Sequence, residues 1–180
     1  MVRAVARWDV NGSSVDVLQM RKALGRFASG ITIVTTGPAE GDDCEIHGMT
    51  ANAFTSVSLR PPLVLVAIAT HAKMHKRIVE TGRYGVSILA QDQEALSRHF
   101  AGAANIPASV NFIWRDGLPL LEGALVHLSC SVHDSHPAGD HTLHVGKVDG
   151  VWYRNGDPLL YYTGSFRALE LIGQEGLWGF

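Results

Sequence analysis

Cysteine is scarce in this sequence, which argues against a disulfide-stabilised secreted domain. The 180 residues include two cysteines, Cys44 and Cys130, too few for a framework of several bridges. The first residues carry Arg3, Arg7 and Asp9 where a secretory signal needs an apolar run. We therefore expect free thiols and a cytoplasmic protein.

Long apolar runs and basic tracts are missing as well. The longest uncharged stretches, residues 46–59 and 61–72, fall short of the roughly 18 apolar residues that a membrane span requires. The 15 Lys and Arg residues are balanced by 17 Asp and Glu residues, which gives a net charge of −2 and no tract for nucleic acid phosphates. We therefore expect no membrane and no nucleic acid partner, and a small molecule or a protein is left as the target.

The length and composition fit a single globular domain over residues 1–180. Hydrophobic residues make up 46% of the chain and charged residues only 18%, below the roughly 25% that is usual. A surface with so few charges is expected to be partly buried by a second copy, and the chain is expected to form a homodimer.

Three helices are expected from apolar spacing and from residues typical of helix ends. In the first, apolar residues recur at helical intervals from Val17 through Phe27. The expected helices cover residues 17–30, capped by Asp16; residues 72–81, ended by Gly82; and residues 92–100, capped by Asp92.

About seven strands are expected, mostly antiparallel because short turns join the later ones. The apolar run 63–69 predicts a buried central strand, whereas the alternation over 124–132 predicts a strand buried on one face, with Cys130 on that face. No βαβ series is present, so closure into a barrel is favoured over a doubly wound sheet. The expected strands cover residues 31–36, 46–69 with a break over 49–59, 84–89, 124–132, 141–154 and 159–162, with turns at 37–43, 136–140 and 155–158.

The common catalytic motifs are also absent, since the sequence has no GxGxxG, P-loop, HExxH, GxSxG or CxxC pattern. Four histidines cluster late in the chain, but His133 and His136, like His141 and His144, would point to opposite faces of a strand. We therefore expect no metal site. Cys130, on an apolar strand face, is expected to be an inert thiol.

Two segments do suggest a ligand. Residues 48–59 combine short polar side chains with little bulk, which suits a flat, hydrogen-bonding ligand such as a flavin, although a plain edge strand has the same composition. Residues 70–77 place Lys73 at a helix start, where free N–H groups attract anions, although a solvated basic turn reads the same way.

Three motifs resemble those of the flavin reductase family that serves two-component flavin-dependent monooxygenases. They are residues 48–64, 137–142 and 158–162, in family order, and the likeness runs from about Leu18 to Arg167. The resemblance implies an FMN-binding split β-barrel that forms a homodimer. It also implies a protein that binds FMN or FAD, takes a hydride from NADH or NADPH, and releases reduced flavin to a separate monooxygenase component.

The same resemblance implies the site residues. His141, in a Gly-Asp-His segment, is expected beside the nicotinamide as the catalytic residue, and Lys73 at the flavin phosphate. Phe166 stands where relatives usually carry tyrosine, which removes a hydroxyl. The remaining expected cofactor-binding residues are Met49, Thr50, Ala51, Asn52, Ser56, Val57, Ser58, His75, Phe100 and Arg167.

Two other functions stay open. One is an FMN oxidase resembling the pyridoxamine-phosphate oxidases, against which the Gly-Asp-His motif and the pair Pro61-Pro62 argue. The other is a non-enzymatic flavin- or haem-binding split-barrel protein, which would show no NADH turnover.

Overall fold

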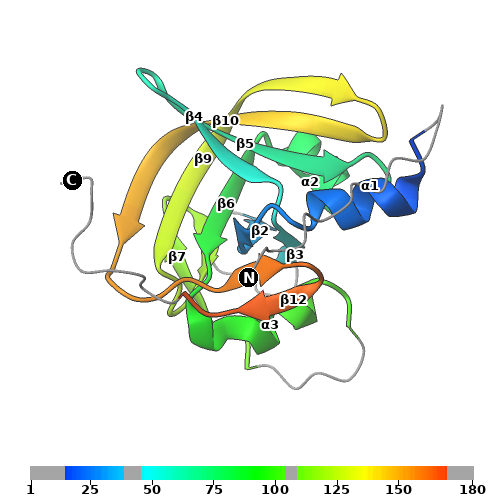
Figure 1. Cartoon of the computed structure of the whole chain (residues 1–180). Coiled ribbons are helices and arrows are strands. Elements are labelled where there is room, and N and C mark those ends of the chain that lie inside the picture. Colours follow the sequence, from blue (N-terminus) through cyan, green and yellow to red (C-terminus); the bar gives the residue numbers. More distant parts are fainter. Residues whose placement is uncertain (1–14, 39–45, 104–108, 170–180) are drawn as a thin grey trace, which may run out of the picture.

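The computed structural model describes residues 15–38, 46–103 and 109–169 (Figure 1). Within these ranges every strand pair is antiparallel, and the helices are few and short, which confirms a mainly β, antiparallel protein. No helix in these ranges is long and apolar enough to cross a membrane. The helices are α1 (Val17–Leu24), α2 (Lys73–Thr81), the 3₁₀ helix η2 (Gln91–Gln93) and α3 (Glu94–Phe100). The strands are β1 (Ser29–Gly30), β2 (Thr32–Thr36), β3 (His47–Ala51), β4 (Phe54–Leu59), β5 (Pro62–Ala69), β6 (Arg83–Ile88), β7 (Phe112–Arg115), β8 (Leu118–Leu121), β9 (Val126–Ala138), β10 (His141–Tyr153), β11 (Leu160–Tyr162) and β12 (Ser165–Arg167).

Seven strands form the main sheet, in the order β3-β2-β6-β9-β10-β5-β4. β3 and β4 lie at opposite edges of this sheet, although only Asn52 and Ala53 separate them in the chain. Three peptide units reach about 10 Å at most, so the sheet must curl until its two edges approach each other at this β3–β4 corner. Among the described residues no ladder joins β3 to β4, so the sheet is not a closed barrel. At the corner the Ala67 N–H donates to the Ala53 carbonyl at 3.0 Å.

Two clusters of buried side chains hold the fold together. The first lies inside the curl of the main sheet, where α2 contributes Met74 and Ile78, both fully buried against strand residues such as Val66. The second joins the main sheet to α3 and to the small sheet β1-β11-β12, which lie next to each other below the main sheet in Figure 1. Burial of such apolar surface is the main source of stability.

The first helix is shorter than expected and has no partner among the described residues. The cap at Asp16 is confirmed, since its carboxylate accepts a bond from the Gln19 N–H at 3.1 Å. However, α1 ends at Leu24 instead of Gly30, and Phe27 lies beyond it. None of its residues is buried, and Phe27 is 82% exposed. The amphipathic pattern therefore predicted the helix, but it did not predict that the described residues leave its apolar side chains exposed.

Two expectations for the first half of the main sheet are wrong. The predicted break over 49–59 is two residues long, because small polar residues pair as well as bulky ones along β3 and β4. The run 63–69 forms β5, second from the edge and not central, and it alternates between buried residues (Val64, Val66, Ile68) and half-buried ones. An apolar run alone does not tell a strand's position in the sheet.

β9 also differs from its expected one-sided burial. His127 and Ser129 are buried, just as Leu128 and Cys130 are, because the β7–β8 hairpin covers that side. The His127 Nε2–H donates to a carbonyl of β8 at 2.7 Å, and the Ser129 hydroxyl donates to Asp116 between β7 and β8 at 2.6 Å. The expectation for Cys130 is confirmed, since burial raises the pKa of its thiol to about 12. Cys44 lies outside the described residues.

Two further boundaries need correction. β9 and β10 run almost to the tip of their hairpin, so the expected turn at 136–140 consists of Gly139 and Asp140 only. Asp92 is not a helix cap, because it lies inside η2, and the Gln93 side chain accepts the bond from the Ala90 N–H at 3.0 Å. The glycine end of α2 is confirmed, since Gly82 has φ +64° and donates to the Ile78 carbonyl.

Candidate active site

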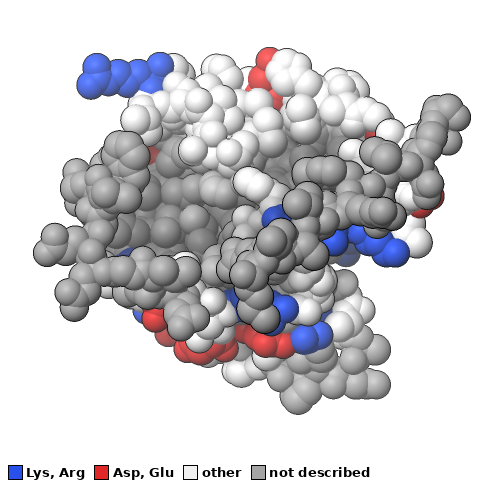
Figure 2. All heavy atoms as spheres, in the orientation of Figure 1, with Lys and Arg blue, Asp and Glu red and all other residues white. Residues whose placement is uncertain are grey.

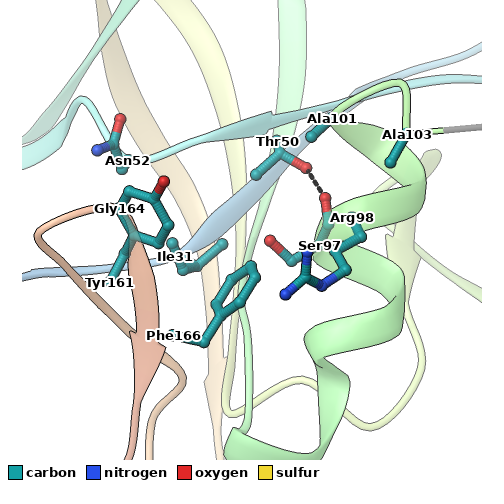
Figure 3. A pocket seen from close by; sticks show the side chains of 10 residues that line it. All are labelled: Ile31, Thr50, Asn52, Ser97, Arg98, Ala101, Ala103, Tyr161, Gly164 and Phe166. Atoms are coloured by element: carbon teal, nitrogen blue, oxygen red, sulfur yellow. Dashed lines mark hydrogen bonds between the residues drawn. The ribbon is translucent and has the colours of Figure 1, made fainter.

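A pocket of about 340 Å³ opens between β3, α3 and the β11–β12 hairpin (Figure 3). Two of the expected flavin-binding residues of β3 and the following corner, Thr50 and Asn52, line it together with Phe166 of β12. Figure 3 shows Tyr161 and Phe166 on one side, Ser97 and Arg98 of α3 on the other, and Thr50 between β3 and the helix. The structure thus brings together residues that lie more than a hundred positions apart in the chain.

β3 and α3 are held unusually close. The Thr50 hydroxyl donates to the Ser97 carbonyl at 2.6 Å. A Cβ at Gly48 would lie 2.4 Å from the Phe100 ring, so only glycine at this position allows the ring to pack flat against the strand. Phe100 also stacks edge-on against Phe112, with ring centroids 6.4 Å apart. Phe100 is therefore placed as a packing residue beneath the pocket, and its expected contact with the flavin stays a prediction.

The side chains of β3 alternate between the pocket and the interior. Thr50 lines the pocket, whereas Met49 and Ala51 pack against the first core cluster. Ala51 therefore offers a ligand its backbone, whereas Met49 is half-buried and keeps part of its side chain accessible.

The α3 side of the pocket carries Arg98, the one cationic side chain among the described residues that line it. The guanidinium lies 4.8 Å from the centre of the Phe166 ring and 2.7 Å from the Glu94 carboxylate. Tyr161 and Phe166 form an edge-to-face pair, 5.5 Å between centroids. In Figure 2 acidic and basic side chains lie next to each other at the lower edge of the molecule, over α3. This wall offers a flat ligand both ring faces and a positive charge.

Sequence reasoning missed Arg98, Ser97 and Tyr161. Tyr161 belonged to an identified motif, and Arg98 directly precedes the His99-Phe100 pair, but neither position showed that its side chain turns toward β3. The Glu94–Arg98 spacing of four residues was a legible signal for an ion pair, although such pairs are common on any helix surface.

A second cavity, about 670 Å³, lies on the other side of the corner and has Asn52 in common with the pocket. Its walls are mostly apolar and include Leu65 and Ala67 of β5, Leu24 of α1 and Phe27 just after this helix. Asn52 is thus the residue of the predicted flavin site that both openings share.

β4 carries the next three expected residues away from both cavities. Ser56, Val57 and Ser58 are at the outer edge of the main sheet, where the register shifts between Ser56 and Ser58. Val57 is 51% exposed, and the Ser58 hydroxyl accepts a bond from the Arg60 N–H at 3.2 Å. None of the three lines either cavity, and their contact with a flavin stays a prediction.

His141 and Lys73 lie at the same end of the sheet as the corner. His141 pairs with Ala69, two residues beyond the Ala67 that bonds the corner, and Lys73 opens α2 shortly after β5 ends. The Thr70 N–H and hydroxyl both donate to the Asp140 carbonyl, at 3.0 and 3.2 Å, which ties the β5–α2 loop to the β9–β10 turn.

The charges at this end influence one another. The Asp140 carboxylate lies 2.7 Å from His141 Nδ1, and this hydrogen bond, with the charge of His141, lowers the pKa of Asp140. Burial also lowers the pKa of His47, at the end of β3 away from the corner, and the cations Lys73 and Arg77 lower it further. The amino-terminal half of α2 therefore carries positive charge that favours an anionic ligand.

Two of the expected cofactor-binding residues, His75 and Arg167, do not line either cavity. His75 is half-buried and its ring faces His144 in the interior, with the two ring nitrogens 3.1 Å apart. Arg167 is exposed and does not line either cavity, while its neighbour Phe166 does. No cluster of three or more metal-ligating side chains occurs within residues 15–38, 46–103 and 109–169.

Comparison with known families decides the relationship. A family described as flavin reductase like domain matches residues 24–170. This chain belongs to that family. The match encloses the corner, both cavities, His141 and Lys73.

Individual relatives agree with this membership. The chain is 68% identical, over 92% of its length and 94% of the relative's, to an NADH-dependent flavin reductase of Rhodococcus sp.. It is 40% identical to the reductase component of 4-hydroxyphenylacetate 3-monooxygenase of Thermus thermophilus, over 83% of this chain and 94% of that protein. Among solved structures it is similar to the NADH:FAD oxidoreductase SgcE6 of Streptomyces globisporus in complex with NAD and FAD fragments, with a TM-score of 0.78 and 37% identity over 88% and 98% of the two chains.

Proposed function

We propose that this protein is an NADH-dependent flavin reductase that reduces FMN or FAD and supplies the reduced flavin to a separate monooxygenase component. The observation that carries the proposal is that the family match, residues 24–170, includes the β3–β4 corner and the residues that line the pocket beside it. The names of the relatives, which include NADH-dependent reductases and the reductase component of a monooxygenase, support the choice of donor and acceptor.

The residues at the corner fit a flavin. A flavin needs hydrogen-bond partners at one edge of its ring, apolar walls and positive charge for its phosphate. Asn52 has an exposed amide at the corner, Tyr161 and Phe166 supply ring faces, and Arg98 and Lys73 supply charge. We therefore place the flavin ring against Asn52. Two sets of predicted contacts flank this residue in the chain: Met49, Thr50 and Ala51 of β3 before it, and Ser56, Val57 and Ser58 of β4 after it.

When bound, the flavin supplies an acceptor for the hydride of NADH, and such a transfer needs alignment of two rings rather than a nucleophile. His141 is suited to orient the nicotinamide, because Asp140 accepts the Nδ1–H and leaves Nε2 free for a ligand. The apolar wall of Phe166 and Tyr161 excludes water from the contact between the rings.

The finer features of the fold belong to this proposal. The curled, unclosed sheet supports a split β-barrel, and the family match over residues 24–170 supports the prediction of a single domain over residues 1–180. The uncovered apolar residues of α1 and the apolar second cavity support a homodimer, with an apparent mass of about 40 kDa expected in solution from a chain of 19.4 kDa. The two-cysteine content supports a cytoplasmic location.

Steady-state NADH oxidation with and without added flavin tests the proposal. Turnover is expected with FMN or FAD, little without flavin, and less with NADPH than with NADH. Absence of flavin-dependent oxidation would overturn it. Oxidation of an amine substrate without NADH would favour the pyridoxamine-phosphate-oxidase-like reading, and flavin or haem binding without turnover would favour the non-enzymatic one. Nothing in the comparisons favours either.

A further inference from the structure

Three polar side chains form a hydrogen-bonded chain between α2 and the β9–β10 hairpin. The Ser135 hydroxyl of β9 lies 2.9 Å from His144 Nδ1, and His144 Nε2 lies 3.1 Å from His75 Nδ1. The two imidazoles are tilted by 38°, with centroids 5.3 Å apart. A neutral His144 ring can satisfy both bonds in either tautomer. With the proton on Nε2 it donates to His75 and accepts from Ser135, and with the proton on Nδ1 the two directions are reversed.

His144 is an unusual residue for its position. It is fully buried on β10, whose other inward positions near it hold Thr142 and Gly146. Burial of a polar ring is costly unless both nitrogens find partners, which Ser135 and His75 provide. An apolar residue would fill the same space without needing hydrogen-bond partners. The two hydrogen bonds of His144 therefore indicate a role beyond filling space.

The α2 end of this hydrogen-bonded chain lies in the same helical turn as Lys73, the predicted phosphate contact. His75 is in the first turn of α2, where its N–H bonds the Ala72 carbonyl at 3.0 Å. The helix is otherwise anchored by Met74 and Ile78, which bury its apolar face against the sheet. The bond to His144 is directional, and it joins the first turn of α2, which Lys73 begins, to β10.

We infer that His144 is a positioning residue: through His75 it fixes the amino-terminal turn of α2 relative to β10, so that Lys73, at the flavin phosphate, keeps its place relative to His141, at the nicotinamide. The inference rests on the proposed function, since Lys73 and His141 are the predicted contacts of the flavin phosphate and the nicotinamide. Ser135 acts at one remove, because its hydroxyl bonds His144 Nδ1 and so holds the ring from the side opposite His75.

The FMN preference, defined as the dissociation constant of riboflavin divided by that of FMN, is a readout that general loosening of the fold would not change. Both ligands share the ring, and only FMN has the phosphate. A Lys73→Ala variant is expected to lower the preference about tenfold, as loss of one charge-assisted bond.

Two variants of His144 separate the bonds. In His144→Gln the amide reaches the place of Nε2 and keeps the bond to His75, so the FMN preference is expected within about twofold of the wild type. In His144→Asn the shorter amide reaches only Ser135, and the preference is expected to fall about fivefold while riboflavin binding is unchanged.

The outcomes distinguish the two levels of the proposal. If Lys73→Ala leaves the preference unchanged, the phosphate seat is wrong and the inference falls with it. If Lys73→Ala lowers the preference but His144→Asn does not, or if Asn and Gln behave alike, only the inference is overturned.

Should the His144 variants not fold, His75→Leu at the half-exposed end is expected to lower the preference as His144→Asn does, and an unchanged preference there would overturn the inference. In the wild type, ¹⁵N NMR should show a coupling across the bond from His75 Nδ1 to His144 Nε2, and its absence would contradict the geometry.

Discussion

The two ends of the candidate site are held together by different forces. At the α3 end, aromatic rings pack closely under and beside the pocket, with Phe100 against Gly48 and Phe166 between Tyr161 and Arg98. At the α2 end, directional bonds join His75 to His144 and His141 to Asp140. Stacked rings suit the recognition of a flat ring system, and directional polar contacts suit a charged group at a defined place. The two kinds of contact therefore suit different parts of the proposed ligands, the flat flavin ring at α3 and the charged phosphate at α2.

The close packing at the α3 end is expected to give the largest effect. A Gly48→Ala variant places a Cβ 2.4 Å from the Phe100 ring, and this overpacking is expected to cost about 3 kcal/mol of unfolding free energy. Gly30→Ala is the matched control, because a Cβ there meets nothing within 4 Å. Urea unfolding measures both variants, and Phe100→Leu should partly restore Gly48→Ala. Equal stability of the two glycine variants would contradict the packing.

The polar end is expected to fail first in acid. Burial lowers the pKa of His144 from 6.5 to about 4, with a smaller effect from His75, so the folded chain resists a proton that the unfolded chain accepts. The stability from neutral His144 is therefore present above pH 6.5 and lost as the pH falls toward 4, by about 2 kcal/mol between pH 7 and 5. His75 faces the ring from α2, and the Tyr84 hydroxyl of β6 donates to the His144 carbonyl; both are also present in the control.

Urea unfolding at several pH values tests this prediction. His144→Gln, which cannot titrate, serves as the control and should lose about 2 kcal/mol less than the wild type over the same interval. The same pH dependence in both proteins would show that the loss comes from other groups, such as His127, whose pKa is also lowered by burial.

His141 tests the polar end through activity. We expect His141→Ala to lower kcat/KM for NADH about tenfold, because the nicotinamide loses its orienting contact. Asp140→Asn keeps the ring but weakens its hold on Nδ1, so a loss of about threefold is expected. Steady-state kinetics with saturating FMN measure both. Unchanged kcat and KM in His141→Ala would remove this residue from the site.

The ring end is expected to show the smallest effect of a single side chain. Arg98→Ala should raise the KM for FMN about threefold, since an exposed ion-paired arginine contributes little beyond its stacking on Phe166. Lys147→Ala is the matched control, because Lys147 is about as exposed and is paired with Asp149 away from both cavities. Equal effects of the two changes would place Arg98 outside the site.

The sequence predicted the elements better than their partners. The helix at α2, its glycine end and the β9–β10 pairing follow from local patterns, because each depends on residues close in the chain. The two-sided burial of His127 and Ser129 depends on the β7–β8 hairpin, which no local pattern indicated. Likewise, the amphipathic pattern of α1 did not indicate that none of its residues is buried by the described part of the chain.

The site followed the same rule. Thr50, Asn52 and Phe166 were predicted and share a pocket, since the motifs that carry them resemble a family pattern. Arg98 and the His75–His144 bond were not predicted, because both arise where separate elements meet in space.

A crystal structure with bound FMN tests the central claim most directly, namely that the flavin ring lies at the β3–β4 corner. The account predicts difference density for the ring in contact with Asn52, next to Thr50 or Phe166, with the phosphate directed toward Lys73. Density for the ring at any place that leaves Asn52 without contact would contradict the account.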